Sequence, residues 1–479
     1  MTQFKKCFFI ITLLCYVNIA FSQRDKNDTD PLFTHAYEKF EKGEYKESYN
    51  DYTAYLTKNP NDNNALYNRG LCAYEMMDYK DAITNFSKSI YAGRKKYDAF
   101  YSRGLCNFKL ENFKLAIADF DTTITLNPDY TKAYTYKGAS LNEQKNYKAA
   151  LIALDKAIEV DPEYESAYYY RAIVNYNLNN FEKGLFDCNK SLGIHPYYDT
   201  YFWRGLIYIS LNKYNEAITD YDTVIAHSPK YATAYYNRAI CYYELKNYEK
   251  ALSDNNKSIE LDATKPDAYY NRALVKFELA NYKGAEPDFN AAIDLKLNEA
   301  KHYLRRGINY YYLTKDIEAL SDLNTSIQKD KNNELAYYYR AIIKYTLQDD
   351  KGVVEDCSSA LALKKSYDTY YQRGISRSAL KDYTGAIEDY NEALKLKPEY
   401  NLAILERGVA YYQLAKDELA LTDLNKAISL NASSGRAYYF RGKLKKYMND
   451  TTGSCQDLTQ AKKLNYSSAE EEILKNGCK

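Results

Sequence analysis

The chain has 479 residues, which is long for one globular core and indicates several domains or an extended array. Its 65 basic and 64 acidic residues give a formal net charge of +1, so no strong field favours nucleic acid or an anionic membrane. Tyrosine occurs 56 times and tryptophan once. Tyrosine suits half-buried surfaces, because its ring can pack while its hydroxyl reaches water or a partner.

The N-terminal segment 1–22 is predicted to be a secretory signal peptide. Lys5 and Lys6 precede an apolar run that ends in small residues before Gln23. The run is short for a membrane span, and an uncleaved N-terminal anchor is the alternative interpretation. We therefore expect an exported protein, periplasmic or extracellular, with residues 23–28 as a short linker and no membrane span in the mature chain.

A basic residue followed by glycine or alanine recurs along the rest of the chain. The spacing is about 34 residues, a period that indicates a repeat array, and two of the steps are shorter by one. His35-Ala36 extends the series backward, so that thirteen repeats tile residues 29–468. The basic residues are Arg69, Arg103, Lys137, Arg171, Arg204, Arg238, Arg272, Arg306, Arg340, Arg373, Arg407 and Arg441.

Each repeat is predicted to form two helices joined by a short turn. In residues 97–130, apolar and small residues recur at three- and four-residue steps from Phe100 to Phe108, and the pattern restarts at Ala116. Pro128 ends the second helix, because proline lacks the backbone donor and disfavours helical geometry in the residue before it.

These repeats resemble tetratricopeptide repeats, a family of helix–turn–helix units with the same period. The small residue of the family's first helix falls on glycine or alanine in all thirteen repeats, and alanine opens the second helix in nine of them. The small residues Ser48, Gly184 and Ser454 also fit that second position, and Val353 is the one departure. The closing proline is present in fewer than half of the repeats. The resemblance implies an all-α fold: a right-handed α-solenoid, or superhelix, of tandem helix–turn–helix units with a C-terminal capping helix.

The expected domain organisation follows from this tiling. Residues 469–479 are expected to form the capping helix, because one repeat cannot bury its apolar face alone and the array must be closed. Cys455 and Cys478 are a candidate disulfide that would pin this helix to the last repeat. The repeat bounds are 29–62, 63–96, 97–130, 131–164, 165–197, 198–231, 232–265, 266–299, 300–333, 334–366, 367–400, 401–434 and 435–468.

An aspartate follows the basic residue by about sixteen positions in most repeats. We expect these residues to form a ladder of ion pairs, within a repeat or between neighbours. The repeat that carries Lys137 has Ala153 in place of the aspartate, which favours pairing within a repeat. The ladder is interpreted as structural, since a catalytic carboxylate would occur once. The aspartates are Asp51, Asp119, Asp187, Asp220, Asp254, Asp288, Asp322, Asp356, Asp389, Asp423 and Asp457.

A block of five repeats is predicted to have been duplicated whole. The segment ESAYYYRAIVNY at 165–176 returns as ELAYYYRAIIKY at 334–345. The same offset maps Cys188 onto Cys357 and carries residues 67–75 onto 236–244. Shared family consensus is the alternative, but consensus does not explain that both blocks contain a repeat shortened by one at the same place.

The resemblance also implies a binding surface, because the first helices of the family line a concave face that binds extended peptides or partner helices. Tyrosines recur at two positions of these helices, and packing against neighbouring helices is the alternative role for each. Two residues before the basic residue lie Tyr67, Tyr101, Tyr169, Tyr236, Tyr270, Tyr338, Tyr371 and Tyr439; five after it lie Tyr74, Phe108, Tyr176, Tyr243, Phe277, Tyr311, Tyr345 and Tyr412.

The expected function is therefore a non-enzymatic scaffold that binds a peptide or partner protein through a tyrosine-lined concave face. The alternative is a glycan or cell-envelope polymer bound in the same aromatic groove. No catalytic residue, metal site or cofactor is expected: the four histidines occupy four different repeat positions, and no nucleotide-binding or hydrolase motif occurs.

Overall fold

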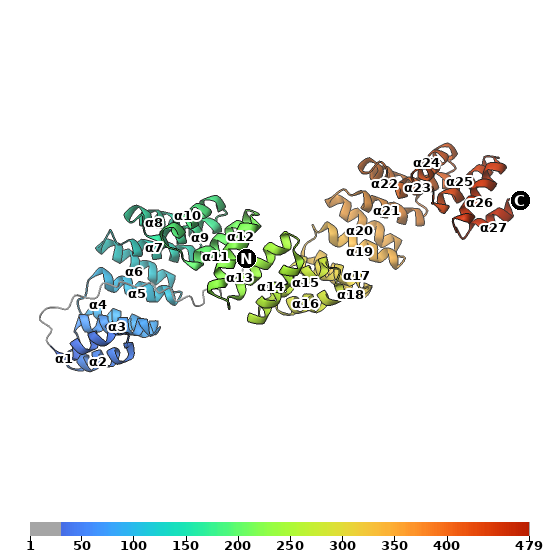
Figure 1. The fold of residues 1–479 in the computed structure, drawn as a ribbon. Helices are drawn as coiled ribbons and strands as arrows, with labels where there is room; N and C mark the ends of the chain where they lie inside the picture. The colour runs from blue at the N-terminus through green and yellow to red at the C-terminus, as the bar shows by residue number, and fades with distance from the viewer. Residues whose placement is uncertain (1–29, 479) are drawn as a thin grey trace. The chain divides into compact units, whose positions relative to one another are not determined.

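A computed structural model describes residues 30–478, and this part of the chain contains 27 α-helices and no β-strand (Figure 1). The all-α prediction is thus confirmed. The predicted signal peptide, residues 1–22, and the linker, residues 23–28, lie outside the described residues. Within the described part, none of the helices combines the length and the apolar character that a membrane crossing requires.

The chain divides into two compact units, residues 1–245 and 246–479. The N-terminal unit contains α1 (Pro31–Glu41), α2 (Tyr45–Lys58), α3 (Asn63–Glu75), α4 (Tyr79–Tyr91), α5 (Tyr97–Lys109), α6 (Phe113–Leu126), α7 (Thr131–Glu143), α8 (Tyr147–Val160), α9 (Glu165–Asn177), α10 (Phe181–Ile194), α11 (Tyr198–Ser210), α12 (Tyr214–His227) and α13 (Ala232–Glu244).

The C-terminal unit continues the same alternation of first and second helices. It contains α14 (Tyr248–Leu261), α15 (Pro266–Glu278), α16 (Tyr282–Asp294), α17 (Ala300–Tyr312), α18 (Asp316–Lys329), α19 (Glu334–Thr346), α20 (Asp350–Leu363), α21 (Tyr367–Ala379), α22 (Tyr383–Leu396), α23 (Asn401–Gln413), α24 (Asp417–Leu430), α25 (Gly435–Tyr447), α26 (Thr451–Lys463) and α27 (Ala469–Lys475).

The turn inside each helical hairpin uses one left-handed residue. In the hairpin of α5 and α6, Glu111 has a φ of 60°, its N–H donates to the Phe108 carbonyl, and the Asn112 N–H donates to the Asn107 carbonyl. This paired bonding satisfies the last carbonyls of the first helix and offsets the cost of about 1 kcal/mol for a left-handed residue with a Cβ. The equivalent residues are Gly43, Met77, Lys145, Asn179, Asn212, Lys246, Ala280, Thr314, Gln348, Lys381, Ala415 and Asn449.

A small residue on the first helix lets a large residue of the second helix pack against it. A Cβ added at Gly374 would lie 2.5 Å from the Tyr390 ring, far inside van der Waals contact. In two repeats the first helix carries alanine and the second helix supplies a cysteine in the same buried cluster, as with Ala341 and Cys357. The match between the sizes of the two residues is not strict. Ala273 on a first helix shares a buried cluster with the large residue Phe289 on the second helix.

The C-terminal helix α27 is tied to the last repeat by a disulfide. Cys455 lies on α26, Cys478 follows α27, and their Cα atoms are 5.4 Å apart. Ser468 occupies the N-cap position but its side chain makes no capping hydrogen bond. Gly477, with a φ of 64°, follows the end of the helix. The cap therefore depends on the disulfide and on packing around buried Ala469.

We expect Gly374→Ala to lower the free energy of unfolding by about 1–3 kcal/mol, the usual cost of overpacking a core. Gly193→Ala on α10 is the matched control, because nothing lies within 4 Å of a Cβ added there. Alanine should stabilise that helix by up to about 1 kcal/mol. Urea denaturation followed by circular dichroism measures both changes, and an unaffected Gly374→Ala midpoint would contradict the packing argument.

Within residues 30–478, the five cysteines outside the disulfide are buried and should be unreactive in the native protein. Burial raises the pKa of the thiols of Cys72, Cys241 and Cys357 to about 12, so almost no thiolate forms near neutral pH. Cys106 and Cys188 have thiol pKa values raised by the same cause.

Iodoacetamide followed by mass spectrometry tests this on a protein that comprises residues 23–479. We expect no label in native buffer and five labels after denaturation without reductant. Seven labels at that step would show that Cys455 and Cys478 are reduced.

Candidate binding surface

An arginine on most of the first helices joins that helix to two second helices. Arg306 on α17 donates from Nε and Nη2 to both carboxylate oxygens of Asp322 on α18, at 2.7 and 2.8 Å. Its Nη1 donates to Oδ1 of Asn290 on the preceding second helix, α16, at 3.0 Å. The predicted pairing within a repeat is confirmed, and the same side chain also holds the neighbouring repeat. We call this recurring arrangement the arginine ladder.

The arginine ladder is repeated in both units. In the N-terminal unit, the repeat of Lys137 has Ala153 in place of the ladder aspartate, and Lys137 pairs backward with Asp121 at 2.6 Å. Each complete rung consists of an arginine, the aspartate of its own repeat and a residue of the preceding second helix. In that order, the other complete rungs are Arg103–Asp119–Ser87, Arg171–Asp187–Asp155, Arg204–Asp220–Asn189, Arg272–Asp288–Asn256, Arg340–Asp356–Asn324, Arg373–Asp389–Ser358, Arg407–Asp423–Asn391 and Arg441–Asp457–Asn425.

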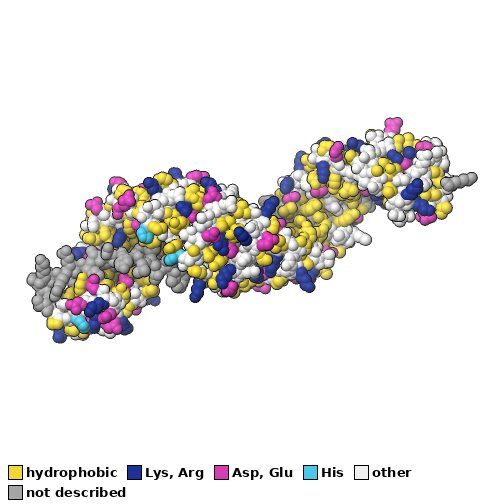
Figure 2. Space-filling model, viewed as in Figure 1, with side chains coloured by type: hydrophobic (Ala, Val, Ile, Leu, Met, Phe, Trp, Pro, Cys, Tyr) yellow, Lys and Arg dark blue, Asp and Glu magenta, His cyan; other side chains and the backbone are white. Residues whose placement is uncertain are grey.

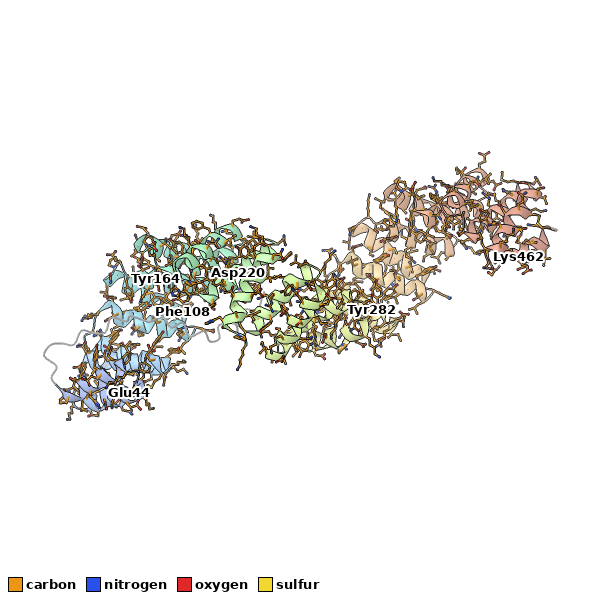
Figure 3. All side chains as sticks on the ribbon, viewed as in Figure 1. Glu44, Phe108, Tyr164, Asp220, Tyr282 and Lys462 are labelled. Atoms are coloured by element: carbon orange, nitrogen blue, oxygen red, sulfur yellow. A yellow bond between two sulfur atoms is a disulfide. The ribbon has the colours of Figure 1, made fainter. Side chains whose placement is uncertain are left out.

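Sequence analysis missed the third member of each rung. The signal is present: a short polar residue stands two positions after the aspartate, as Asn290 does after Asp288, and sixteen positions before the next arginine. Two positions along a helix bring a side chain about 200° round the axis, so the aspartate and this residue face different neighbours. Asp220 on α12 is labelled in Figure 3.

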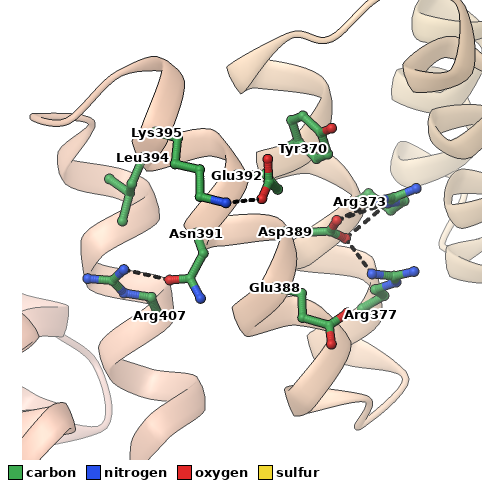
Figure 4. A pocket seen from close by; sticks show the side chains of 10 residues that line it. All are labelled: Tyr370, Arg373, Arg377, Glu388, Asp389, Asn391, Glu392, Leu394, Lys395 and Arg407. Carbon is green, nitrogen blue, oxygen red and sulfur yellow. Dashed lines mark hydrogen bonds and ion pairs between the residues drawn. The ribbon is translucent and has the colours of Figure 1, made fainter.

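A surface hollow of about 790 Å³ lies on one rung of the ladder in the C-terminal unit (Figure 4). Asp389 is held there by Arg373 and Arg377, at 2.6 and 2.9 Å. On the same wall Lys395 pairs with Glu392. These charges are paired with one another, so this part of the hollow belongs to the structural ladder.

Tyrosine rings cover the arginines of the ladder. The Arg306 guanidinium carbon lies 5.9 Å from the Tyr303 ring centre and 5.7 Å from that of Tyr310, within the range of a cation–π contact. The ring three residues before the arginine recurs at Tyr168, Tyr201, Tyr235, Tyr269, Tyr337, Tyr370 and Tyr438. Many of the 56 tyrosines therefore serve the ladder.

The two predicted rows of tyrosines lie on the other side of the first helices. Residues two before and five after the arginine are roughly 140–160° round the helix from it. The first row is deeply packed in places: Tyr67 is fully buried and its hydroxyl lies 3.2 Å from Ser102 on the next first helix. Burial raises the pKa of its hydroxyl. Tyr101 and Tyr439 are also buried, so these three are packing residues and not exposed contacts.

The rest of the first row is half-buried: Tyr169, Tyr236, Tyr270, Tyr338 and Tyr371. Tyr371 packs edge-on against Tyr400 at 5.2 Å, and burial raises its pKa to about 12. Tyr270 packs edge-on against His302 at 4.7 Å. These rings fill the space between successive first helices and leave one edge to solvent.

The second row is more accessible. Tyr74, Tyr176 and Tyr243 are half-buried, and Tyr345 is 44% exposed. In the C-terminal unit Tyr312, next to Tyr311 of this row, is also 44% exposed, and its ring stacks on that of Tyr282 on α16 at 4.6 Å (Tyr282 is labelled in Figure 3). We call these rings the tyrosine face of their unit: Tyr74, Tyr176 and Tyr243 in the N-terminal unit, and Tyr311, Tyr312 and Tyr345 in the C-terminal unit.

The charges around these rings are mixed in sign. Figure 2 shows basic and acidic side chains interspersed over the visible face of both units, in keeping with the near-zero net charge. Among the described residues, no group of three or more histidine, cysteine, aspartate or glutamate side chains could hold a metal ion.

The recurring hairpins define an α-solenoid repeat protein. Family models described as tetratricopeptide repeats match residues 33–95, 97–130, 131–164, 232–265, 266–299 and 367–400, and one described as a TPR repeat matches 205–246. Together they cover more than half of the chain, which therefore belongs to the tetratricopeptide repeat family.

Solved structures are similar to this chain at low identity. The APC/C hetero-tetramer Cut9-Hcn1 is 16% identical over 86% of this chain and 89% of that one, with a TM-score of 0.41. A tetratricopeptide repeat protein of Parabacteroides merdae is 19% identical over 51% and 98%, with a TM-score of 0.40. The C-terminal part of a TPR repeat-containing protein of Cytophaga hutchinsonii is 18% identical over 49% and 98%, with a TM-score of 0.42.

No curated protein matches the chain significantly. The tetratricopeptide repeat is generally a non-enzymatic scaffold fold, and its presence supports a role in protein–protein interaction with protein partners.

We expect Arg306→Ala to lower the free energy of unfolding by about 3 kcal/mol, because it strands the buried Asp322 carboxylate and removes the bond to α16. Hydrogen exchange should rise in α16 and α18, which both lose a partner. Lys301→Ala is the control, since its ion pair with Glu299 is exposed and should be worth less than about 1 kcal/mol. Equal effects of the two substitutions would show that the ladder does not hold the repeats together.

Proposed function

We propose that this protein is an exported, non-enzymatic scaffold that binds an extended peptide or a partner protein on the tyrosine face. The observation that carries the proposal is the recurrence of partly exposed tyrosine rings five residues after the basic residue on several first helices. Tyr345 is 44% exposed at this position, and so is Tyr312, which follows Tyr311 of the same row. The arginine ladder occupies the opposite side of the same helices, so a ligand on these rings would not compete with the hydrogen bonds of the ladder.

Tyrosine is well suited to this task. Its ring gives a large contact area with few rotatable bonds, and its hydroxyl can donate to or accept from a peptide backbone. The rings of the tyrosine face are fixed by their neighbours, as Tyr74 is by Tyr79 at 5.5 Å and Tyr176 is by Trp203 at 5.5 Å. Binding therefore costs little side-chain entropy.

Export is supported by two features. The predicted signal peptide is one, and the disulfide between Cys455 and Cys478 is the other, because structural disulfides persist in oxidising compartments. Cleavage of the signal peptide would give a periplasmic or extracellular protein.

The test is affinity capture of proteins from envelope and culture extracts of the source organism by the mature chain. We expect the Tyr312→Ala/Tyr345→Ala double variant to lose at least ten-fold of the captured protein, while circular dichroism shows it folded. Tyr91→Ala is the matched control, since Tyr91 is 91% exposed on the second helix α4, away from the tyrosine face.

Two outcomes would contradict the proposal. Equal loss in the Tyr91→Ala protein would mean that the tyrosine face is not the binding surface. Binding on a glycan array without any captured protein would favour the alternative, a glycan or envelope-polymer binder.

A further inference from the structure

Lys443 places a charge at a repeat position that is otherwise apolar. It lies on α25 in the C-terminal unit, two residues after the ladder arginine Arg441. Two residues turn the helix by about 200°, so Lys443 points away from the ladder, on the side where the rows of tyrosines lie. The same position of the preceding repeats holds Leu71, Leu105, Ala139, Ile173, Leu206, Ile240, Leu274, Ile308, Ile342, Ile375 and Val409.

Lys443 also differs from the other half-buried cations of α25, because it has no carboxylate partner. Four basic side chains of this helix are half-buried. Arg441 and Lys445 both pair with Asp457 of the ladder, at 2.7 and 2.9 Å. Arg436 pairs with a glutamate of α23 at 2.8 Å. Among residues 30–478, no ion pair joins the Lys443 ammonium group to a carboxylate.

Two aromatic rings hold the Lys443 ammonium group in place. Its Nζ lies 5.9 Å from the ring centre of Tyr412 on α23 and 5.5 Å from that of Tyr439 on α25. Tyr439 is buried and Tyr412 is half-buried. The Tyr439 hydroxyl donates to Oε2 of Glu472 on α27 at 3.5 Å, and this carboxylate makes no ion pair with Lys443. The rings therefore position the cation and cover part of it without neutralising it.

The place of Lys443 at the end of the array does not by itself explain a half-buried charge. A terminal repeat needs polar residues where no further repeat covers it. An exposed lysine meets that need, as Lys446 does on the same helix. Lys443 is half-buried instead, and a charge that is partly removed from water without a counter-charge is costly. A bound anion would offset that cost.

A positioned ammonium group without a counter-charge is complementary to a carboxylate. We propose that Lys443, with Tyr412 and Tyr439, binds the carboxylate of an aspartate or glutamate side chain in the partner segment. The ammonium group can donate charge-assisted hydrogen bonds to this carboxylate, and the half-buried Tyr412 ring can pack against its methylene groups. This inference rests on the proposed function, because it names one residue type of the segment that would bind.

The test compares two small probes, N-acetyl-glutamate amide and the neutral N-acetyl-glutamine amide, on a protein that comprises residues 23–479. Ligand-observed NMR titrations give both affinities. We expect the wild type to bind the glutamate probe at least about five-fold more tightly than the glutamine probe, because only the former can pair with Lys443. Lys443→Gln should abolish this preference. Lys426→Gln is the matched control, since it removes the same charge from an exposed site on the second helix α24 and should keep the preference.

Urea denaturation separates a binding role of Lys443 from a packing role. The Lys443→Gln midpoint should equal or exceed that of the wild type, because the substitution breaks no ion pair and removes a partly desolvated charge. A lower midpoint together with an equal loss of both probes would mean that Lys443 only packs between the rings. Equal affinity of the wild type for the two probes would overturn the site, as would a preference that survives in Lys443→Gln.

The carboxylate site and the proposed function fail separately. A glutamate preference that depends on Lys443, without capture of any partner protein, would leave the site and remove the scaffold proposal. Capture of a partner that the Lys443→Gln protein retains in full would keep the scaffold and remove the site.

Discussion

The repeat array depends on one side chain that makes bonds in two directions. A single helical hairpin cannot bury its own apolar face, so its stability comes from its neighbours. Apolar packing between hairpins is not directional and would tolerate some sliding. The arginine, bidentate to its own aspartate and bonded by its third nitrogen to the preceding second helix, sets the angular position of each hairpin against the last.

This arrangement also explains the tyrosine content. A guanidinium that is partly removed from water is stabilised by its carboxylate and also by the aromatic rings on either side. The rings cover it without competing for its hydrogen bonds. Rings on the opposite side of the same helix occupy a different environment, between first helices. One residue type thus has two roles, separated by half a turn of helix.

Much of the fold was predictable from the sequence, because a fixed period presents the same helical pattern in every repeat. The helical pairs, the small residue at Gly374 and the pairing of Arg306 with Asp322 all follow from spacing. How deeply each tyrosine is buried could not be predicted from this spacing. Tyr67 and Tyr371 share a repeat position, yet one is fully buried and the other half-buried. Their neighbours on the next repeat differ, and a pattern within one repeat does not contain that information.

The features that sequence reasoning missed are contacts between repeats. The backward bond of the arginine involves Asn290, which belongs to the repeat before. Period analysis aligns equivalent residues and does not show which ones meet across the boundary, so the candidate site was visible in the sequence only as rows of side chains.

The disulfide at the end of the array makes its two ends unequal. Nearest-neighbour arrays lose structure from their termini, where a hairpin has a single neighbour. At the C-terminal end Cys455 and Cys478 join α27 covalently to α26, whereas α1 has no covalent tie among the described residues. The last helix of the array can therefore separate from its hairpin only after reduction, so the redox state of the surroundings controls fraying at that end.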